Sequence, residues 1–204
     1  MGPVISSGRL TFAALALLVA ASSLLVAGRD ARAEGEGIDV VMHRDKLYDV
    51  AIVGNKIWVV GFPGRILFSA DAGKTWSGQD GGGGEALFSV HFANESSGWA
   101  VGRDGLILAT KDGGAHWAPQ KSPKDVHLFD LSFLDDKVGW ASGFFGSVIG
   151  TKDGGATWDL LRYSDVEGED PSLNGIDFPT PTSGWTVGEF GIVLGDILSR
   201  MLGA

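Results

Sequence analysis

Residues 99–117 read WAVGRDGLILATKDGGAHW, and the chain repeats this pattern twice, as WVVGFPGRILFSADAGKTW at 58–76 and WASGFFGSVIGTKDGGATW at 140–158. In each copy the first and last tryptophans are 18 residues apart, and each copy begins 41 residues after the one before it. A fixed step of this size indicates a protein built from repeated structural units. The sequence therefore predicts a fold made of similar blocks.

A short alternating segment comes before each copy. The four segments are LYDVAI (47–52), LFSVHF (87–92), LFDLSF (128–133) and LNGIDF (173–178). Alternation with a period of two predicts strands, so Phe88, Val90 and Phe92 are expected on one face, with Ser89 and His91 on the other. The last segment leads into a fourth copy, GWTVGEFGIVLGD, which ends without a closing tryptophan.

Each unit is predicted to hold four short strands, for example 87–92, GWAVG (98–102), LILAT (106–110) and a strand that begins at Trp117. The short glycine-rich connections are typical of antiparallel hairpins. Four strands in about 40–45 residues match one propeller blade. We therefore predict an all-β propeller of about four four-stranded antiparallel blades. The expected domain is 34–204, with blades at about 43–80, 84–121, 125–163 and 172–204. A β-sandwich is the alternative, but the fixed step disfavours it.

The N-terminus resembles a secretory signal peptide. Arg9 precedes the apolar run 11–27, and Ala31-Arg32-Ala33 supplies small residues for cleavage. Residues 1–33 are therefore expected to be removed near Ala33, which leaves an exported protein in the periplasm or an organelle lumen. The alternative is an uncleaved membrane anchor, for which the apolar run is near the minimum length.

Charge and cysteine content exclude several kinds of function. The formal net charge of −9 becomes about −11 once residues 1–33 are removed, because three arginines and one aspartate leave with them. Nucleic acids and anionic lipid surfaces require clustered Lys and Arg, so they are not expected as partners. The chain has no cysteine, which excludes disulfides and thiolate chemistry.

The turn before each closing tryptophan contains an aspartate followed by glycine. The three octets read SADAGKTW (69–76), TKDGGAHW (110–117) and TKDGGATW (151–158). An Asp carboxylate can accept nearby backbone N–H groups, and glycine allows the positive φ that such turns often need. A turn is required in every blade whereas a catalytic site is required once, so a structural role is expected. The residues concerned are Asp71, Gly73, Thr75, Trp76, Asp112, Gly114, Trp117, Asp153, Gly155, Thr157 and Trp158.

These octets resemble the S/T-x-D-x-G-x-T-W Asp-box of BNR-repeat propellers, with His116 in place of the expected Thr. The longer pattern, GWAVG-xx-G-xx-x-T-x-DGG-x-x-W, resembles the photosystem II stability and assembly factor family over roughly residues 38–196. The resemblance implies a non-catalytic propeller, lumenal or periplasmic, that binds protein and holds a membrane-protein assembly intermediate. Fold follows from such motifs more securely than function does.

The chain departs from that family in size, because members usually have more blades. Three interpretations stay open: a short relative, a truncated fragment, or a piece that completes its ring by self-association. An incomplete ring leaves sheet faces and edges uncovered. Residues 38–41 could alternatively supply the missing outer strand of the fourth blade and close a ring of four.

The G-x-x-G tips carry the residues that differ most between copies, namely Phe62, Arg103, Phe144, Phe145 and Phe190. Aromatic and Arg side chains at loop tips are typical of binding hot spots. We take them as a candidate partner-binding rim. The alternative is that these rings fold back over the core.

A carbohydrate-directed function is the alternative, either a carbohydrate-binding propeller or a sialidase-like glycoside hydrolase fragment. Sialidase chemistry needs an Arg cluster and a Tyr nucleophile with acidic partners. Beyond residue 33 the chain has only five arginines and two tyrosines, and Tyr48 is assigned to the core because it occupies the position of Phe88 and Phe129. The four histidines show no metal-ligand spacing. No catalytic, cofactor or metal site is therefore predicted, and no cofactor.

Overall fold

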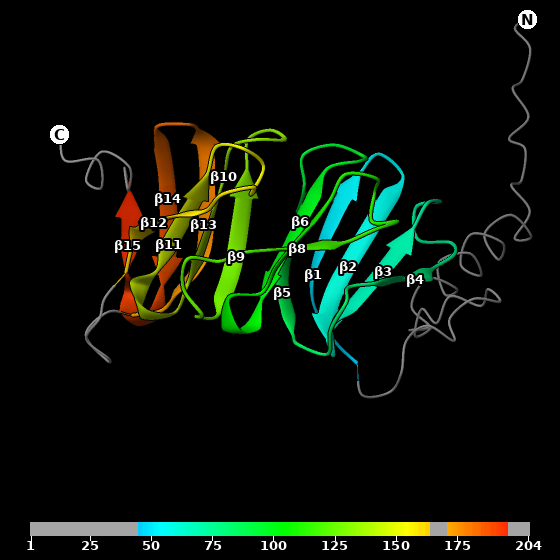
Figure 1. Cartoon of the computed structure of the whole chain (residues 1–204), viewed down its shortest axis with the longest axis horizontal. Coiled ribbons are helices and arrows are strands. Elements are labelled where there is room, and N and C mark those ends of the chain that lie inside the picture. The colour runs from blue at the N-terminus through cyan, green and yellow to red at the C-terminus, as the bar shows by residue number, and fades with distance from the viewer. Residues whose placement is uncertain (1–44, 164–170, 196–204) are drawn as a thin grey trace, which may run out of the picture. The chain divides into compact units, whose positions relative to one another are not determined.

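The computed structural model describes residues 45–163 and 171–195 as strands joined by turns (Figure 1). The strands are β1 (Lys46–Val53), β2 (Lys56–Phe62), β3 (Arg65–Ser69), β4 (Ser77–Asp80), β5 (Leu87–Phe92), β6 (Gly98–Gly102), β7 (Ile107–Thr110), β8 (Ala118–Gln120), β9 (Leu128–Phe133), β10 (Gly139–Gly143), β11 (Val148–Thr151), β12 (Asp159–Arg162), β13 (Leu173–Thr180), β14 (Ser183–Gly188) and β15 (Val193–Gly195). Single 3₁₀ turns follow β6, β10 and β14: η1 (Arg103–Gly105), η2 (Phe144–Gly146) and η3 (Glu189–Gly191).

The strands form four antiparallel sheets, each ordered as in the chain: β1–β4, β5–β8, β9–β12 and β13–β15. The predicted all-β propeller architecture is confirmed, with three strands rather than four in the described part of the last blade. The fourth strand of each complete blade begins one residue after the closing tryptophan instead of at it. The predicted signal peptide 1–33 and the proposed extra strand 38–41 lie outside the described residues.

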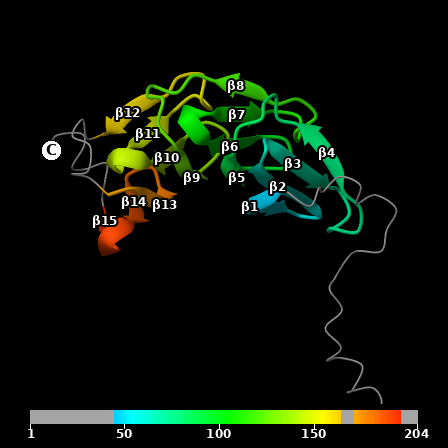
Figure 2. The same cartoon turned by 90° about the horizontal axis from the view of Figure 1, so that it is seen from below.

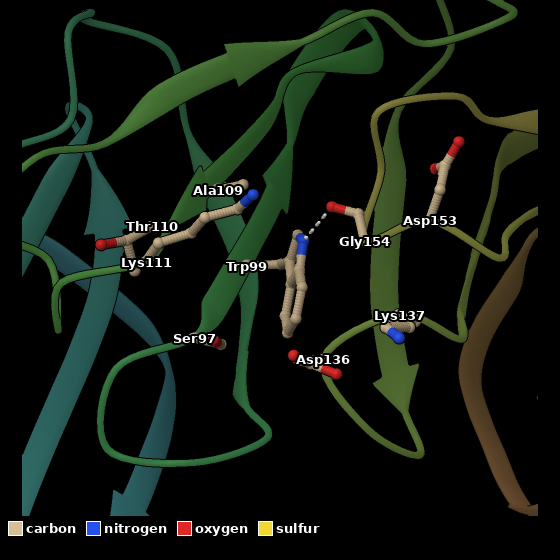
Figure 3. Close-up of a pocket in the computed structure, with 9 residues that line it drawn as sticks. All are labelled: Ser97, Trp99, Ala109, Thr110, Lys111, Asp136, Lys137, Asp153 and Gly154. Carbon is tan, nitrogen blue, oxygen red and sulfur yellow. Dashed lines mark hydrogen bonds between the residues drawn. The ribbon is translucent and has the colours of Figure 1, made fainter.

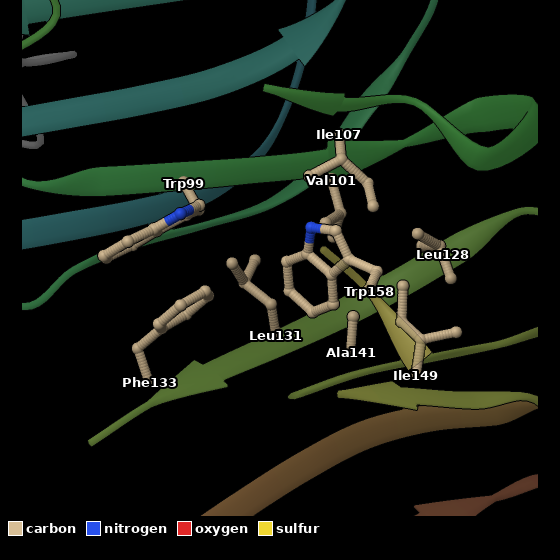
Figure 4. Close-up of a cluster of buried hydrophobic side chains, with 9 residues drawn as sticks. All are labelled: Trp99, Val101, Ile107, Leu128, Leu131, Phe133, Ala141, Ile149 and Trp158. Carbon is tan, nitrogen blue, oxygen red and sulfur yellow. The ribbon is translucent and has the colours of Figure 1, made fainter. Parts of the chain in front are cut away.

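The four blades lie side by side in chain order within residues 45–195, with the inner strands β1, β5, β9 and β13 packed against one another (Figure 2). Each pair of neighbouring blades encloses an apolar cluster. Between the second and third blades it includes Trp99, Val101, Leu131, Phe133 and Trp158 (Figure 4). The core is therefore divided among the blade junctions, as repeat proteins require.

One aromatic pair recurs at every internal junction. A tryptophan of the second strand stacks on a phenylalanine of the next inner strand, with ring centroids 3.7 Å apart for Trp58–Phe92, 3.7 Å for Trp99–Phe133 and 3.9 Å for Trp140–Phe178. All three tryptophans are buried. The strict spacing of the tryptophans in the sequence thus follows from one repeated packing contact.

No helix in the described part of the chain is long and apolar enough to cross a membrane.

Candidate functional site: an aromatic row at the blade tips

Two rims bound the blades. One set of blade ends, which we call the tip rim, holds the starts of the inner strands and the G-x-x-G tips (61–64, 102–105, 143–146 and 188–191). The turn rim is the opposite set of ends, with the turns 69–76, 110–117 and 151–158. Strands β2 and β3 meet at the tip rim and strands β3 and β4 at the turn rim, because the sheets are antiparallel.

Glycine fixes the backbone of the tips. The amide of Arg103 donates to the carbonyl of Ala86 at 2.9 Å, and Phe144 donates in the same way to His127 at 3.0 Å. The chain passes so close that a Cβ on Gly102 or Gly143 would overlap the carbonyl oxygen of Ala86 or His127. Each tip is thus tied to the start of the inner strand of its own blade, and the residues between the glycines are free to vary.

The third residue of three tips has a left-handed backbone: φ is 51° at Asp104, 54° at Phe145 and 56° at Phe190. Asp tolerates this region, whereas a bulky aromatic residue does so only at a cost. Strained residues of this kind concentrate at binding and active sites. The two phenylalanines therefore mark the tip rim as a functional candidate.

A β-bulge at the start of the inner strands directs their second residue away from the cores. The register shifts between Leu47 and Asp49 and again between Leu87 and Ser89. As a result Phe88 is absent from the cluster that holds Val90 and Phe92, so the predicted common face of these three residues is wrong. The assignment of Tyr48 to the core is also wrong, because its ring packs on Phe88 and belongs to none of the three core clusters. An extra residue in the strand reverses the alternation that follows it.

The rings placed by these bulges join those of the tips in one row. Tyr48 lies 5.6 Å from Phe88, and Phe88 lies 5.6 Å from Phe129, between ring centroids. Phe129 meets Phe144 edge-on at 4.9 Å. We call this the aromatic row, and it continues through Phe145 to Tyr163 with centroid distances of 5.9 and 6.1 Å. Six rings from three blades thus form a continuous series of contacts.

Polar and charged groups border the aromatic row. His127 stacks on Phe144 with centroids 4.7 Å apart, and its Nδ1 lies 3.1 Å from a carboxylate oxygen of Asp104. The Lys124 ammonium lies 4.3 Å from the centroid of the Tyr163 ring. Arg103 is half exposed and faces Asp104 at 3.5 Å. The row therefore offers apolar ring surface next to groups of both charges.

The fourth blade does not extend the row. Asn174 stands where Tyr48, Phe88 and Phe129 stand in the other blades. Phe190 is 96% exposed, and within residues 45–163 and 171–195 its ring contacts no other aromatic ring. At the other end Phe62 is 38% exposed. Of the predicted rim residues, the structure brings Phe144 and Phe145 into the row, places Arg103 near it, and leaves Phe62 and Phe190 apart.

On the turn rim the three aspartates make the same contacts. Asp71 Oδ1 accepts the backbone N–H of Thr75 at 2.8 Å, and Asp153 Oδ1 accepts that of Thr157 at 2.9 Å. In the second turn Asp112 accepts the His116 amide at 2.9 Å, and its other oxygen lies 2.7 Å from His116 Nδ1. The His116 ring thus takes the place of the threonine hydroxyl. These hydrogen bonds, led by those from the backbone of Thr75 and His116, lower the pKa of Asp71 and of Asp112 to about 2.

A hydrogen-bonded latch connects the second and the third turn to the preceding blade. Gln120 Nε2 donates to the Gly154 carbonyl at 2.9 Å, and its Oε1 accepts from Trp158 Nε1 at 3.0 Å. Gln79 makes the equivalent pair with Gly113 and Trp117 at 3.0 and 3.1 Å. Trp76 instead donates to Gly73 of its own turn, at 3.0 Å.

A cavity of about 220 Å³ opens at the turn rim between the second and third blades (Figure 3). Trp99 lies between its two sides and donates from Nε1 to the Gly154 carbonyl at 3.0 Å. Trp58 makes the same bond to Gly113, so the surroundings of this cavity are part of the repeat. The aromatic row, which differs from blade to blade, is the stronger candidate for a specific binding site.

Comparison with known proteins assigns the type of blade. The family model of the photosynthesis system II assembly factor YCF48 matches residues 120–197, which cover the strands of the third blade and of the described fourth blade. These blades are of the photosystem II assembly factor type. The resemblance predicted from the repeats is thereby confirmed. A comparison with curated proteins gives no match.

Solved structures with similar folds include YCF48 from Cyanidioschyzon merolae, with 19% identity and a TM-score of 0.54 over 76% of this chain and 68% of that one. The computationally designed Ika8 protein shares 14% identity and a TM-score of 0.60 over 75% of this chain and 46% of its own. An ancestral GH74 enzyme shares 13% identity and a TM-score of 0.61 over 74% of this chain and 23% of its own. At these identities the likeness concerns the fold alone.

Most of the aromatic row could not be predicted from the sequence. The sequence does single out Tyr48, Phe88 and Phe129, since three of the four inner strands have an aromatic second residue. Strict alternation assigns these residues to the core, and the bulges overturn that assignment. Nothing in the repeat pattern pointed to His127 or Tyr163, which belong to the segments before and after the repeat strands.

Proposed function

We propose that this chain is a non-catalytic propeller that binds a segment of another protein at the aromatic row, in the assembly or stabilisation of a membrane-protein complex. The aromatic row is the observation that carries the proposal. Rings held by mutual contact lose little conformational entropy on binding and offer large apolar area, which is why aromatic residues dominate protein interfaces. The match to an assembly factor family supports a protein as the ligand.

The chemistry of the row limits the partner. Apolar and aromatic side chains would pack on the rings, and a Lys or Arg would stack on them by cation–π attraction. The net charge of −9 favours such a basic segment over an acidic one. We therefore propose an extended segment with aromatic and basic residues from a membrane-protein assembly intermediate.

The arginines of the described residues do not support a sialidase. Arg65 pairs with Asp45 at 2.8 Å, and Arg103 faces Glu85 and Asp104 at 3.7 and 3.5 Å. Arg162 donates to the Gly146 carbonyl in a third blade. A sialidase requires such side chains to converge on one carboxylate. This dispersion favours binding over glycoside hydrolysis.

The binding proposal is tested with synthetic peptides that cover the exported loops and termini of membrane proteins from the same organism. Fluorescence titration measures their affinity for the wild-type chain. Tyr48→Ala and Phe145→Ala are expected to weaken the best peptide at least about tenfold, as hot-spot truncations do. Phe190→Ala is the matched control and should leave the affinity unchanged, because its ring lies outside the row. An equal loss of affinity in all three variants would mean that the aromatic row is not the binding site.

Two measurements test the remaining parts of the proposal. Turnover of fluorogenic glycosides, or glycan binding that Tyr48→Ala abolishes, would replace the proposed protein partner with a carbohydrate. Export is proposed from residues 1–33, and N-terminal sequencing of the isolated protein should find a start near Glu34. An unprocessed N-terminus in the membrane fraction would mean an anchor instead.

A further inference from the structure

The last blade presents an apolar face that no other blade of residues 45–195 covers. Trp185 is 54% exposed, Val187 48% and Val193 62%. In the other blades the residues at these positions are buried: Trp58, Trp99 and Trp140 for Trp185, and Ile66, Ile107 and Val148 for Val193. The face of the fourth blade is therefore one half of a blade junction.

The first blade presents the other half. Leu47 is 45% exposed, Val50 51% and Ile52 64%. Ile52 has the position of Phe92, Phe133 and Phe178, which receive the stacked tryptophan at the three internal junctions. Val50 corresponds to Val90, Leu131 and Ile176, all buried. The two end faces are thus complementary residue by residue, with Trp185 matched to Ile52.

The polar groups at the ends match in the same way. At internal junctions the tryptophan Nε1 donates to the carbonyl of a turn in the next blade, Trp58 to Gly113 and Trp99 to Gly154, both at 3.0 Å. The corresponding residue of the first blade is Ala72, which has the same left-handed backbone, with φ of 58°. The carbonyl of Ala72 is therefore the expected acceptor for Trp185 Nε1.

Within residues 45–163 and 171–195 the two faces do not meet. Each inner strand packs on the next, and β1 and β15 lie at opposite ends of an arc (Figure 2). The four described blades span an open arc, so a ring that brings both end faces into contact must hold more than these four blades (Figure 2). A complementary pair of faces at the two ends of an arc generates a ring when a second copy closes it.

We propose that two copies of this chain join head to tail, with the last blade of each against the first blade of the other, in one ring of eight blades. The operation is a twofold rotation, which creates two identical junctions. Each junction would bury the Trp185 face on the Leu47, Val50 and Ile52 face. This arrangement covers both apolar ends and the sheet faces that would otherwise invite non-specific association.

Thiol cross-linking tests this arrangement directly, because the chain has no cysteine of its own. The variant with both Ile52→Cys and Trp185→Cys is treated with a short bismaleimide, and products are weighed by mass spectrometry under denaturing conditions. The expected product is a doubly linked dimer that does not extend to longer species. An internally linked monomer would show that the ring closes on itself. Unlinked chains, or a ladder of longer oligomers, would equally overturn a ring of two.

Charge substitutions provide a second test, which measures the native mass of the protein without chemical cross-linking. Native mass is expected at twice that of one chain for the wild type, and at one chain for Trp185→Glu and for Ile52→Lys. Head-to-tail pairing places residue 185 of one copy beside residue 52 of the other, so the double variant should regain the dimer. Leu160→Glu is the control, since this residue is 39% exposed on β12, outside both end faces. A wild-type monomer, or a dimer that survives both single substitutions, would refute the proposal.

Discussion

At the turn rim Asp112 and Asp153 make the same hydrogen bonds in successive blades, whereas at the tip rim Arg103 and Asp104 of one blade give way to Phe144 and Phe145 in the next. The backbone repeats at both rims. At the turn rim, side chains stabilise the backbone through hydrogen bonds. At the tip rim, glycines allow the close backbone contacts, so the side chains between them are not needed to stabilise the backbone. Repetition therefore marks the residues that maintain the blades, and variation marks those available for binding.

The largest expected effect comes from disturbing the close backbone contact at the tip rim. Gly102→Ala should lower the free energy of unfolding by about 3 kcal/mol, because its Cβ would overlap the Ala86 carbonyl oxygen, a backbone atom. Urea unfolding followed by tryptophan fluorescence measures the change. Gly83→Ala is the control, since nothing lies within 4 Å of its added Cβ, and it should stay within about 0.5 kcal/mol of wild type. Equal stability of the two variants would contradict the role assigned to the first tip glycine.

Breaking a latch of the turn rim should have the next largest effect. Gln120→Leu leaves the Trp158 indole N–H without its acceptor, at a cost of about 1–2 kcal/mol in the free energy of unfolding. Gln120→Glu retains an acceptor for Trp158 but loses the N–H that donates to the Gly154 carbonyl, so it tests the other hydrogen bond of the latch. Thermal unfolding compares the three proteins, and peptide affinity at the tip rim should not change in either variant. If Gln120→Leu alters peptide binding but not stability, the division of roles between the rims is wrong.

Relief of strain at the tip rim should give a smaller effect of opposite sign. Phe190→Asn is expected to raise the free energy of unfolding by about 0.5–1 kcal/mol, because Asn tolerates the left-handed backbone that Phe190 adopts at φ 56°. The control Phe190→Ala should show no gain, since alanine also disfavours this region. Chemical denaturation at one protein concentration resolves the difference. A gain for alanine equal to that for asparagine would attribute the effect to loss of the exposed ring rather than to strain.

The smallest effect per residue concerns the acid sensitivity of the turn rim. The pKa of Asp71 and of Asp112 is lowered from 3.8 to about 2 in the folded chain. Their contribution to stability is thus fully present above about pH 4 and is lost as the pH falls towards 2. Denaturation midpoints between pH 5 and pH 2 should fall less steeply for Asp71→Asn with Asp112→Asn than for the wild type. An unchanged slope would mean that these turns already open before the carboxylates gain protons.

The blades can be predicted from the sequence alone, because a stacked tryptophan, a tip glycine and an Asp-containing turn must recur wherever one sheet packs on the next. It also indicated the variable tips, since Phe144 and Phe145 depart from a pattern that otherwise repeats. These inferences depend on local geometry that is the same in every copy. Such geometry requires the same residues at the same positions, which appear in the sequence as a 41-residue repeat.

Whether equivalent residues are buried or exposed depends on how the blades pack, which the repeat pattern does not contain. A bulge of one residue moves Phe88 and Tyr48 from the expected core to a shared row, and alternation alone carries no sign of it. Trp185 has the same sequence context as Trp99 but is exposed, because burial is a property of the neighbour and not of the residue. The same motif is core between two blades and surface at the end of the arc.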